Sequence, residues 1–127
     1  MATIDVATEA KQDAGNIALA SIDKKLTNLT AGEWEKIAAS TTDQVLGASG
    51  AVADCLMGLL VVPATTSPGA VSIKDGSGSA VIVFTGGPSS VSNLVPFYIP
   101  LGTKSAAGAW KVTTGANVSV IAVGNFT

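Results

Sequence analysis

The sequence contains no histidine and no arginine, and its single cysteine is Cys55. Histidine is the commonest general base and metal ligand near neutral pH, so its absence removes most familiar catalytic and metal sites. One cysteine excludes a disulfide within the chain. Cys55 lies in an apolar run, which indicates a buried small side chain rather than a nucleophile, because no histidine can activate its thiol.

Charged residues are scarce in the last eighty-two positions, which carry only five, whereas the first forty-five positions carry eleven. A soluble domain usually has charges at roughly a quarter of its positions. The carboxy-terminal surface must then consist mainly of Ser, Thr, Gly, Ala and Val, and few ions would lose hydration when it is covered. The composition therefore predicts one part of a larger assembly rather than an enzyme.

The charge balance also bears on partners and location. The net charge is −2, and seven scattered lysines cannot form the basic footprint that nucleic acid requires. The longest apolar stretch, residues 55–62, is too short to span a membrane. Residues 1–5 lack the basic flank and apolar run of a signal peptide. We therefore expect no nucleic-acid or membrane partner, and synthesis in a cytoplasm.

Residues 1–31 differ from the rest, and the pattern from Thr8 to Leu29 predicts a helix. Four apolar residues spaced 3, 4 and 3 form an a/d seam over two heptads, and leucine at a with isoleucine at one d position favours trimers or tetramers over dimers. Two heptads are too few to hold chains together alone, so an amphipathic helix lying on its own domain or on a partner is the alternative. The candidate anchor or oligomer residues are Leu19, Ile22, Leu26 and Leu29.

Residues 32–127 have the character of a β-domain. Runs rich in Val and Ile predict strands, separated by turn signals every 8 to 12 residues or so, and this spacing is typical of a sandwich or jelly roll. Residues 33–39 can start a further strand, with Trp34 as an anchor. We therefore predict a mainly β chain, with an antiparallel β-sandwich or jelly-roll domain over 32–127 preceded by an N-terminal α-helical arm over 1–31. The strands are expected near residues 43–47, 54–62, 70–74, 79–85, 94–101, 108–114 and 117–124.

Two of the predicted strands are apolar on both faces. Leu59–Val62 and Ala80–Phe84 do not alternate between apolar and polar residues. A two-layer sandwich buries only one face of each strand. The second face must be covered, most simply by neighbouring subunits, which agrees with the scarcity of charge.

No catalytic, cofactor or metal site can be drawn from the remaining polar residues. The loop Asp75–Ser79 lacks the ending of a phosphate-binding loop and the spaced carboxylates of a calcium loop, and a hairpin turn explains it. Glu33 and Glu35 are closely paired acids, but a solvated strand edge explains them better than glycosidase chemistry. Trp110 is expected to be a core or interface anchor.

Two stretches resemble virion proteins of tailed bacteriophages. Residues 10–22, with the pattern KQDxGNxxLxxI, are similar to helical segments of such proteins. Residues 108–124 are similar to the ending of small phage structural proteins, where that segment closes a β-domain, and residues 96–102 fit the same type. The resemblance covers about half the chain. It implies a virion component with an anchoring helix and an exposed β-domain, and it carries over no catalytic residues.

The residues and the resemblance together lead to one expected function and two alternatives. We expect a capsid decoration, cement or head-fibre protein that oligomerises, as a trimer in the first instance with a dimer left open, and binds the major capsid protein or another virion protein. Its location would be the virion, after synthesis in the bacterial cytoplasm. The first alternative is a tail fibre, tail tip or adaptor that binds a host receptor through Trp34, Tyr98 or Trp110. The second, a glycan-degrading enzyme, has little support because carboxylates are few.

Overall fold

The computed structural model describes Asn16, Leu19 and residues 32–127, and residues 32–127 form one compact unit. Asn16 and Leu19 have helical backbone. The rest of the predicted helical arm lies outside the described residues, so the arm stays a prediction. Residues 32–127 contain no helix and eight strands: β1 (Glu33–Ile37), β2 (Gln44–Val45), β3 (Cys55–Pro63), β4 (Val71–Asp75), β5 (Val81–Phe84), β6 (Phe97–Lys104), β7 (Trp110–Thr114) and β8 (Val118–Asn125).

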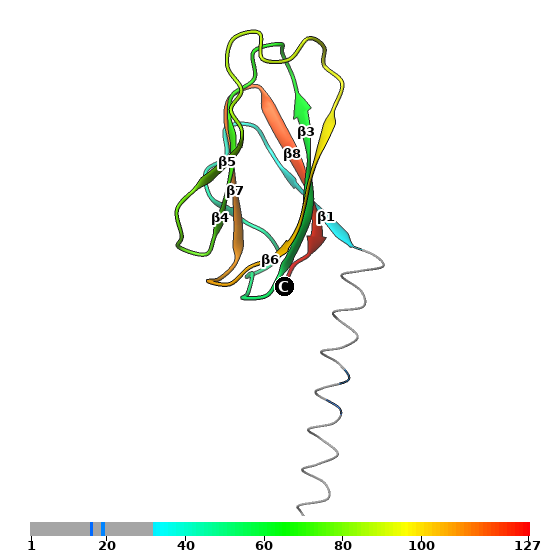
Figure 1. The fold of residues 1–127 in the computed structure, drawn as a ribbon, viewed down its shortest axis with the longest axis vertical. Coiled ribbons are helices and arrows are strands. Elements are labelled where there is room, and N and C mark those ends of the chain that lie inside the picture. Colours follow the sequence, from blue (N-terminus) through cyan, green and yellow to red (C-terminus); the bar gives the residue numbers. More distant parts are fainter. Residues whose placement is uncertain (1–15, 17–18, 20–31) are drawn as a thin grey trace, which may run out of the picture. The chain divides into compact units, whose positions relative to one another are not determined.

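The eight strands form two four-stranded antiparallel sheets, which lie side by side as two layers (Figure 1). The first, called sheet A, has the order β1-β8-β3-β6, and the second, sheet B, has the order β2-β7-β4-β5. Every ladder between neighbouring strands is antiparallel. The predicted class, a mainly β domain built as an antiparallel sandwich, is confirmed.

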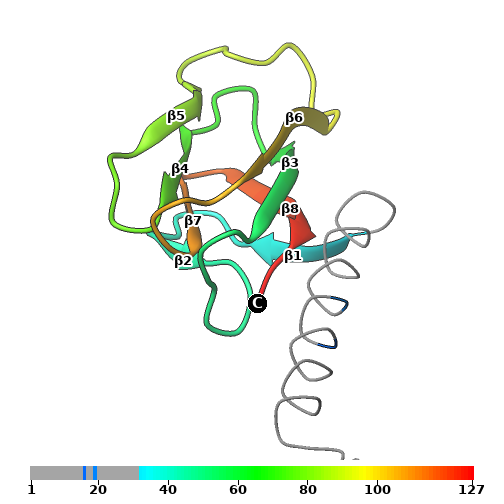
Figure 2. The ribbon, with the colours of Figure 1, turned by 60° about the horizontal axis from the view of Figure 1, so that its bottom comes forward.

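The strand order identifies the sandwich as a jelly roll. The first strand pairs with the eighth, the second with the seventh, the third with the sixth and the fourth with the fifth. The chain is therefore arranged like one long hairpin that has been rolled up, and the rolling adds the pairs β3·β8 and β4·β7. Eight strands in two such sheets define the double Greek-key roll. Figure 2 shows the consequence for the outline: β5 and β6 lie on the same side of the sandwich and are joined by the link 85–96.

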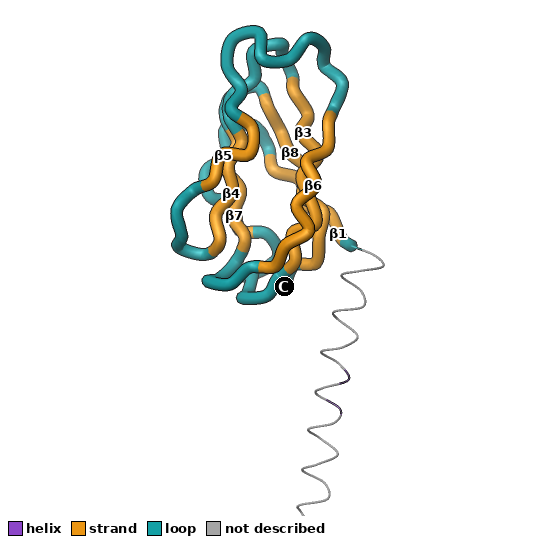
Figure 3. The backbone as a smooth tube through the Cα atoms, in the orientation of Figure 1, coloured by secondary structure: helices purple, strands orange, loops and turns teal. Residues whose placement is uncertain are grey.

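One apolar core fills the space between the sheets. Along β8 the burial alternates strictly, with Val118, Val120 and Ala122 buried and the residues between them half-buried. Buried Val, Leu and Ile side chains each contribute about 1.5–3 kcal/mol. The loops gather at the two ends of the sandwich (Figure 3), so the core is bounded by strands on both layers. The core residues are Ile37, Leu46, Leu56, Leu59, Val61, Val71, Ile73, Trp110, Val112, Val118, Val120, Ala122 and Phe126.

Strand β6 was predicted over residues 94–101. In the structure it begins after Pro96 and continues to Lys104. Proline has no amide N–H to give to a ladder, so it favours the start of a strand rather than its interior. The amide of Val95 instead donates to the side chain of Asn93 at 3.1 Å, as in a local turn. The later end arises because Thr103 and Lys104 pair with Leu56 and Cys55 beyond Gly102.

A buried carboxylate closes one end of the sandwich. Asp54 has no exposed surface, and its carboxylate accepts hydrogen bonds from the amides of Ala51 and Thr127, each at 2.9 Å, and from the Thr127 hydroxyl at 2.6 Å. The Asp54 carbonyl accepts a bond from the Trp110 indole N–H at 2.9 Å. A buried charge is stable only when it is well bonded. Asp54 thus joins the 47–54 loop, the β7 tryptophan and Thr127, which follows β8.

Replacing Asp54 with alanine is expected to lower the free energy of unfolding by about 3 kcal/mol, because buried amide donors lose their acceptor at about 1–3 kcal/mol each. Asp54→Asn keeps one carbonyl acceptor and should lose less. Equilibrium denaturation in urea would measure both variants. A loss below about 1 kcal/mol for Asp54→Ala, within the range of an ordinary exposed substitution, would contradict this role for Asp54.

Candidate functional site

The outward side of sheet A is apolar. Successive side chains of a strand point to opposite faces, so the outward residues are those that alternate with the core residues. Leu60 lies between the buried Leu59 and Val61, and Ile121 lies between the buried Val120 and Ala122. We call this surface face A, and its residues are Trp34, Lys36, Gly58, Leu60, Val62, Tyr98, Pro100, Ser119, Ile121 and Val123.

The ladders arrange face A in rows that cross all four strands. One row is Trp34, Val123, Gly58 and Pro100, and the next is Lys36, Ile121, Leu60 and Tyr98. Trp34 is 70% exposed and Tyr98 is 48% exposed, although both are on strands. Lysine is the only charged residue in the two rows. An apolar patch of this kind on a soluble protein usually marks a contact surface.

The Tyr98 ring lies across Gly58 on this face. A side-chain carbon built on Gly58 would come within 2.2 Å of the Tyr98 hydroxyl oxygen and 2.6 Å of the Ile99 carbonyl oxygen. The register between β3 and β6 shifts between Leu56 and Gly58, and this shift places Gly58 opposite Pro100 rather than opposite Leu101. Such a bulge re-aims side chains locally. It allows the ring to lie on the sheet rather than stand away from it.

Face A continues into an edge of the sandwich that carries no charge. Residues 76–103, which include β5, the link 85–96 and most of β6, contain no charged side chain. The outer strands β5 and β6 each have one unpaired side. Val81, Ile82, Leu94 and Val95 are all more than half exposed. Natural proteins usually protect sheet edges with charges or proline. Pro100 lies on β6, but neither edge strand has a charged side chain before Lys104, which is typical of a surface that another chain covers.

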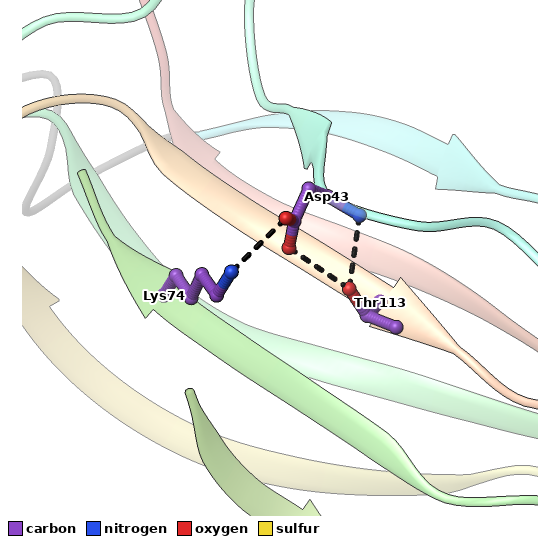
Figure 4. A network of polar contacts seen from close by, with 3 residues as sticks. All are labelled: Asp43, Lys74 and Thr113. Carbon is purple, nitrogen blue, oxygen red and sulfur yellow. Dashed lines mark hydrogen bonds and ion pairs between the residues drawn. The ribbon is translucent and has the colours of Figure 1, made fainter. Parts of the chain in front are cut away.

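The outward side of sheet B carries an ion pair. Lys74 and Asp43 form an ion pair at 3.0 Å, and the Thr113 hydroxyl donates to Asp43 at 3.1 Å (Figure 4). The Asp43 amide donates in turn to the Thr113 hydroxyl oxygen at 2.9 Å. The hydrogen bond from Lys74 is the main cause that lowers the pKa of Asp43. The two outer faces therefore differ, with an ion pair on one and mainly apolar side chains beside Lys36 on the other.

The predicted anchor residues lie mostly outside the described part of the chain. Leu19 has helical backbone and is 65% exposed, while Ile22, Leu26 and Leu29 are not described. The four are therefore not brought together or separated by the structure. Their role as an oligomer or anchor seam stays a prediction.

The paired acids Glu33 and Glu35 lie at a strand edge, as expected, with Glu33 exposed and Glu35 half-buried. They lie on the edge strand β1 with Ile37, on the side that faces sheet B. Glu33 accepts a hydrogen bond from the Phe126 amide, and Glu35 accepts bonds from Gln44 at 3.0 Å and from the Gly47 amide at 2.9 Å. Both carboxylates hold the chain together at this edge. Because they occupy the inward positions, Trp34 points outward and is not a core anchor.

The structure places three other candidate residues within the fold: Trp110, Cys55 and Asp75. Trp110 is a core residue, 6% exposed. Cys55 is half-buried, and burial raises the pKa of its thiol, which lowers its reactivity near neutral pH. Asp75 begins the predicted hairpin turn between β4 and β5, and its carboxylate accepts bonds from the amides of Ala106, Ala107 and Gly108 at 2.8, 2.9 and 3.3 Å.

Sequence reasoning missed the outward residues of β8. The two outward positions between Ser119 and Asn125 are both apolar, Ile121 and Val123. The run from Val118 to Val123, which is apolar except at Ser119, could have indicated this. The position of Tyr98 over Gly58 had no signal in the sequence, because it depends on the bulge in β3. Among the described residues, no group of three or more His, Cys, Asp and Glu side chains could hold a metal ion. In the same part of the chain no helix is long and apolar enough to cross a membrane.

No family model matches the chain, and no curated protein or solved structure is significantly similar to it. The jelly-roll assignment therefore rests on strand order alone. A fold of this kind serves several unrelated functions. The function has to be argued from face A and the uncharged edge.

A side chain at position 58 should disturb both the ring and the neighbouring backbone. We expect Gly58→Ala to lower the free energy of unfolding by about 2 kcal/mol, within the range for overpacking. Adding Tyr98→Ala should recover part of the loss, because it removes the ring but not the contact with the Ile99 carbonyl. A double-mutant cycle in urea would measure the coupling, and strictly additive losses would show that the ring does not lie over Gly58.

Stability should fall in acid because two carboxylates bind protons less readily in the folded chain. The bond from Lys74 lowers the pKa of Asp43, and the amide of Ala106, followed by that of Ala107, lowers the pKa of Asp75. Their contribution is present above the unfolded pKa, near about 3.9, and is lost as pH falls through the lower folded pKa. Urea midpoints measured from pH 6 to pH 2 should therefore fall in the acid range, and more gently in Asp75→Asn. An unchanged pH dependence in that variant would contradict the assignment.

Proposed function

We propose that this chain is a structural component of a phage virion, a capsid decoration, cement or head-fibre protein that acts by assembly. The observation that supports this most is the apolar surface formed by face A, where Lys36 is the one charged residue, and the uncharged edge of residues 76–103. Covering it removes apolar area from water at about 25 cal/mol per Å², and almost no ion has to be dehydrated. The resemblance of residues 10–22 and 108–124 to phage virion proteins supports the location.

The proposed partners are further copies of the chain and the major capsid protein or another virion protein. The arm over residues 1–31 would anchor the protein, with Leu19, Ile22, Leu26 and Leu29 as the contact seam, and a trimer is the state proposed from that seam. Repetition of a modest contact at many symmetric sites would stabilise the particle. The jelly roll would then lie on the outside of the shell as the exposed domain.

A tail fibre, tail tip or adaptor that binds a host receptor is the second candidate. The observation that favours it is the exposure of two aromatic side chains, Trp34 and Tyr98, on one sheet face. Aromatic rings offer a large rigid contact surface with a polar group. Both rings lie on strands rather than on loops, and Trp110, the third aromatic considered, is buried. This arrangement suits a flat contact with a protein better than a pocket for a ligand.

Copy number in the particle separates the two candidates. Quantitative mass spectrometry of purified virions would compare this chain with the major capsid protein. A decoration protein is expected at a copy number approaching that of the capsid protein. A handful of copies per particle would instead favour the tail or a unique vertex, and absence from the particle would contradict both proposals.

A further inference from the structure

We infer that Phe126 and Thr127, the two residues that follow β8, act as a strap that holds β1 in sheet A, and that β1 opens as a separate unit when this strap is released. Opening removes Trp34 and Lys36 from face A, so the strap determines whether that face is complete. The inference uses only contacts within the β-domain. It goes beyond the proposed function and does not depend on it.

Strand β1 has little apolar contact with the rest of the sandwich. Ile37 is its one core residue, whereas β8 supplies Val118, Val120 and Ala122. Within residues 32–127, β1 lies at the end of sheet A and pairs with β8 alone. Segments with few buried apolar contacts and exposed backbone hydrogen bonds open at a lower free energy than the whole domain. Strand β1 therefore needs other contacts to stay in the sheet.

The strap supplies such contacts at the first residue pair of the strand, Glu33 and Gly124. The Phe126 amide donates a hydrogen bond to the Glu33 carboxylate. The Phe126 ring lies against Gly124, because a side-chain carbon built on this glycine would come within 2.8 Å of two ring carbons. The strap thus touches both members of the pair at which separation of β1 from β8 begins.

The other end of the strap is fixed to the loop before β3. Thr127 donates through its amide and its hydroxyl to the buried Asp54 carboxylate, at 2.9 and 2.6 Å. Its carbonyl oxygen accepts hydrogen bonds from the amides of Ser49 and Gly50, at 3.2 and 2.9 Å. Bonds to an ionised carboxylate are stronger than those between neutral groups. Thr127 is therefore the firmly held end, and weakening it should also loosen the neighbouring Phe126.

The same loop holds the second carboxylate of β1. Glu35 accepts hydrogen bonds from the Gln44 side chain at 3.0 Å and from the Gly47 amide at 2.9 Å. A side-chain carbon built on Gly47 would lie 2.3 Å from the Thr127 carbonyl oxygen, so this glycine lies directly beside the strap. Gly47 therefore contacts both β1 and the strap, and we expect the two to open together.

Native-state hydrogen exchange of the full-length chain, followed by NMR, tests the strap. The β1 amides that bond to β8 should exchange faster than the amides at the centre of β3, because β1 opens separately. Thr127→Val removes the hydroxyl bond to Asp54 and alters no residue of β1. It should speed exchange of these β1 amides by about tenfold, the usual effect of losing one hydrogen bond to a charged group. Equal exchange in β1 and β3, or unchanged β1 rates in Thr127→Val, would overturn the inference.

Asp75→Ala is the matched control, because it also removes a carboxylate that accepts backbone amides but makes no contact with β1. It should speed exchange at the centre of β3, which requires global unfolding, and leave the β1 amides unchanged. Acceleration of β1 equal to that in Thr127→Val would show a general loss of stability and no strap. Urea denaturation would give the global stability of each variant.

A double-mutant cycle tests whether the two ends of the strap act as one unit. Glu33→Ala removes the acceptor of the Phe126 amide and should speed β1 exchange, whereas Glu33→Gln keeps a carbonyl acceptor and should have a smaller effect. With Thr127→Val already present, Glu33→Ala should add less than it does alone, because the strap is already loosened. Independent effects that simply multiply would contradict a strap that joins Glu33 to Asp54.

Discussion

Successive side chains of a β-strand point to opposite faces, and this constraint determines both the core and face A. In β8 the inward positions hold Val118, Val120 and Ala122, so Ile121 and Val123 must point outward. A sandwich of two sheets has only one interior, and it cannot bury both faces of its central strands. The apolar residues in excess of the core therefore form a surface. Their burial requires a further layer that neither sheet supplies.

The two outer faces show how that surface differs from an ordinary one. On sheet B, Asp43, Lys74 and Thr113 satisfy one another by hydrogen bonds and remain hydrated at the surface. On sheet A the acids of β1 are turned inward, where Glu33 and Glu35 bind backbone amides. Their inward position leaves Trp34 on the outside. The distribution of charge thus favours covering face A and disfavours covering the opposite face, because removing a hydrated ion pair from water costs more than removing apolar side chains.

Most of the fold was predictable from the sequence, because strand alternation and turn residues are local signals. The Val-rich run at 117–124 and the Asp75–Ser79 turn were both assigned correctly. The sequence left open whether the sandwich has the strand order of a jelly roll. Strand pairing depends on contacts between residues that are far apart in the chain. The outward direction of Trp34 was missed because it follows from the inward position of Glu35. That position depends on hydrogen bonds to Gln44 and to the Gly47 amide, which lie on a later part of the chain. The bulge at Gly58 was missed because nothing in the run from Leu56 to Val62 marks an extra residue.

Face A is expected to be covered by protein when the chain is assembled. Hydroxyl-radical footprinting of the full-length chain over a concentration series would measure this, with Trp34 and Tyr98 as reporters. Their oxidation rates should fall as the chains associate, while the rate at the core residue Trp110 stays low throughout. Oxidation of Trp34 and Tyr98 at the same rate in dilute and in associated protein would contradict the account.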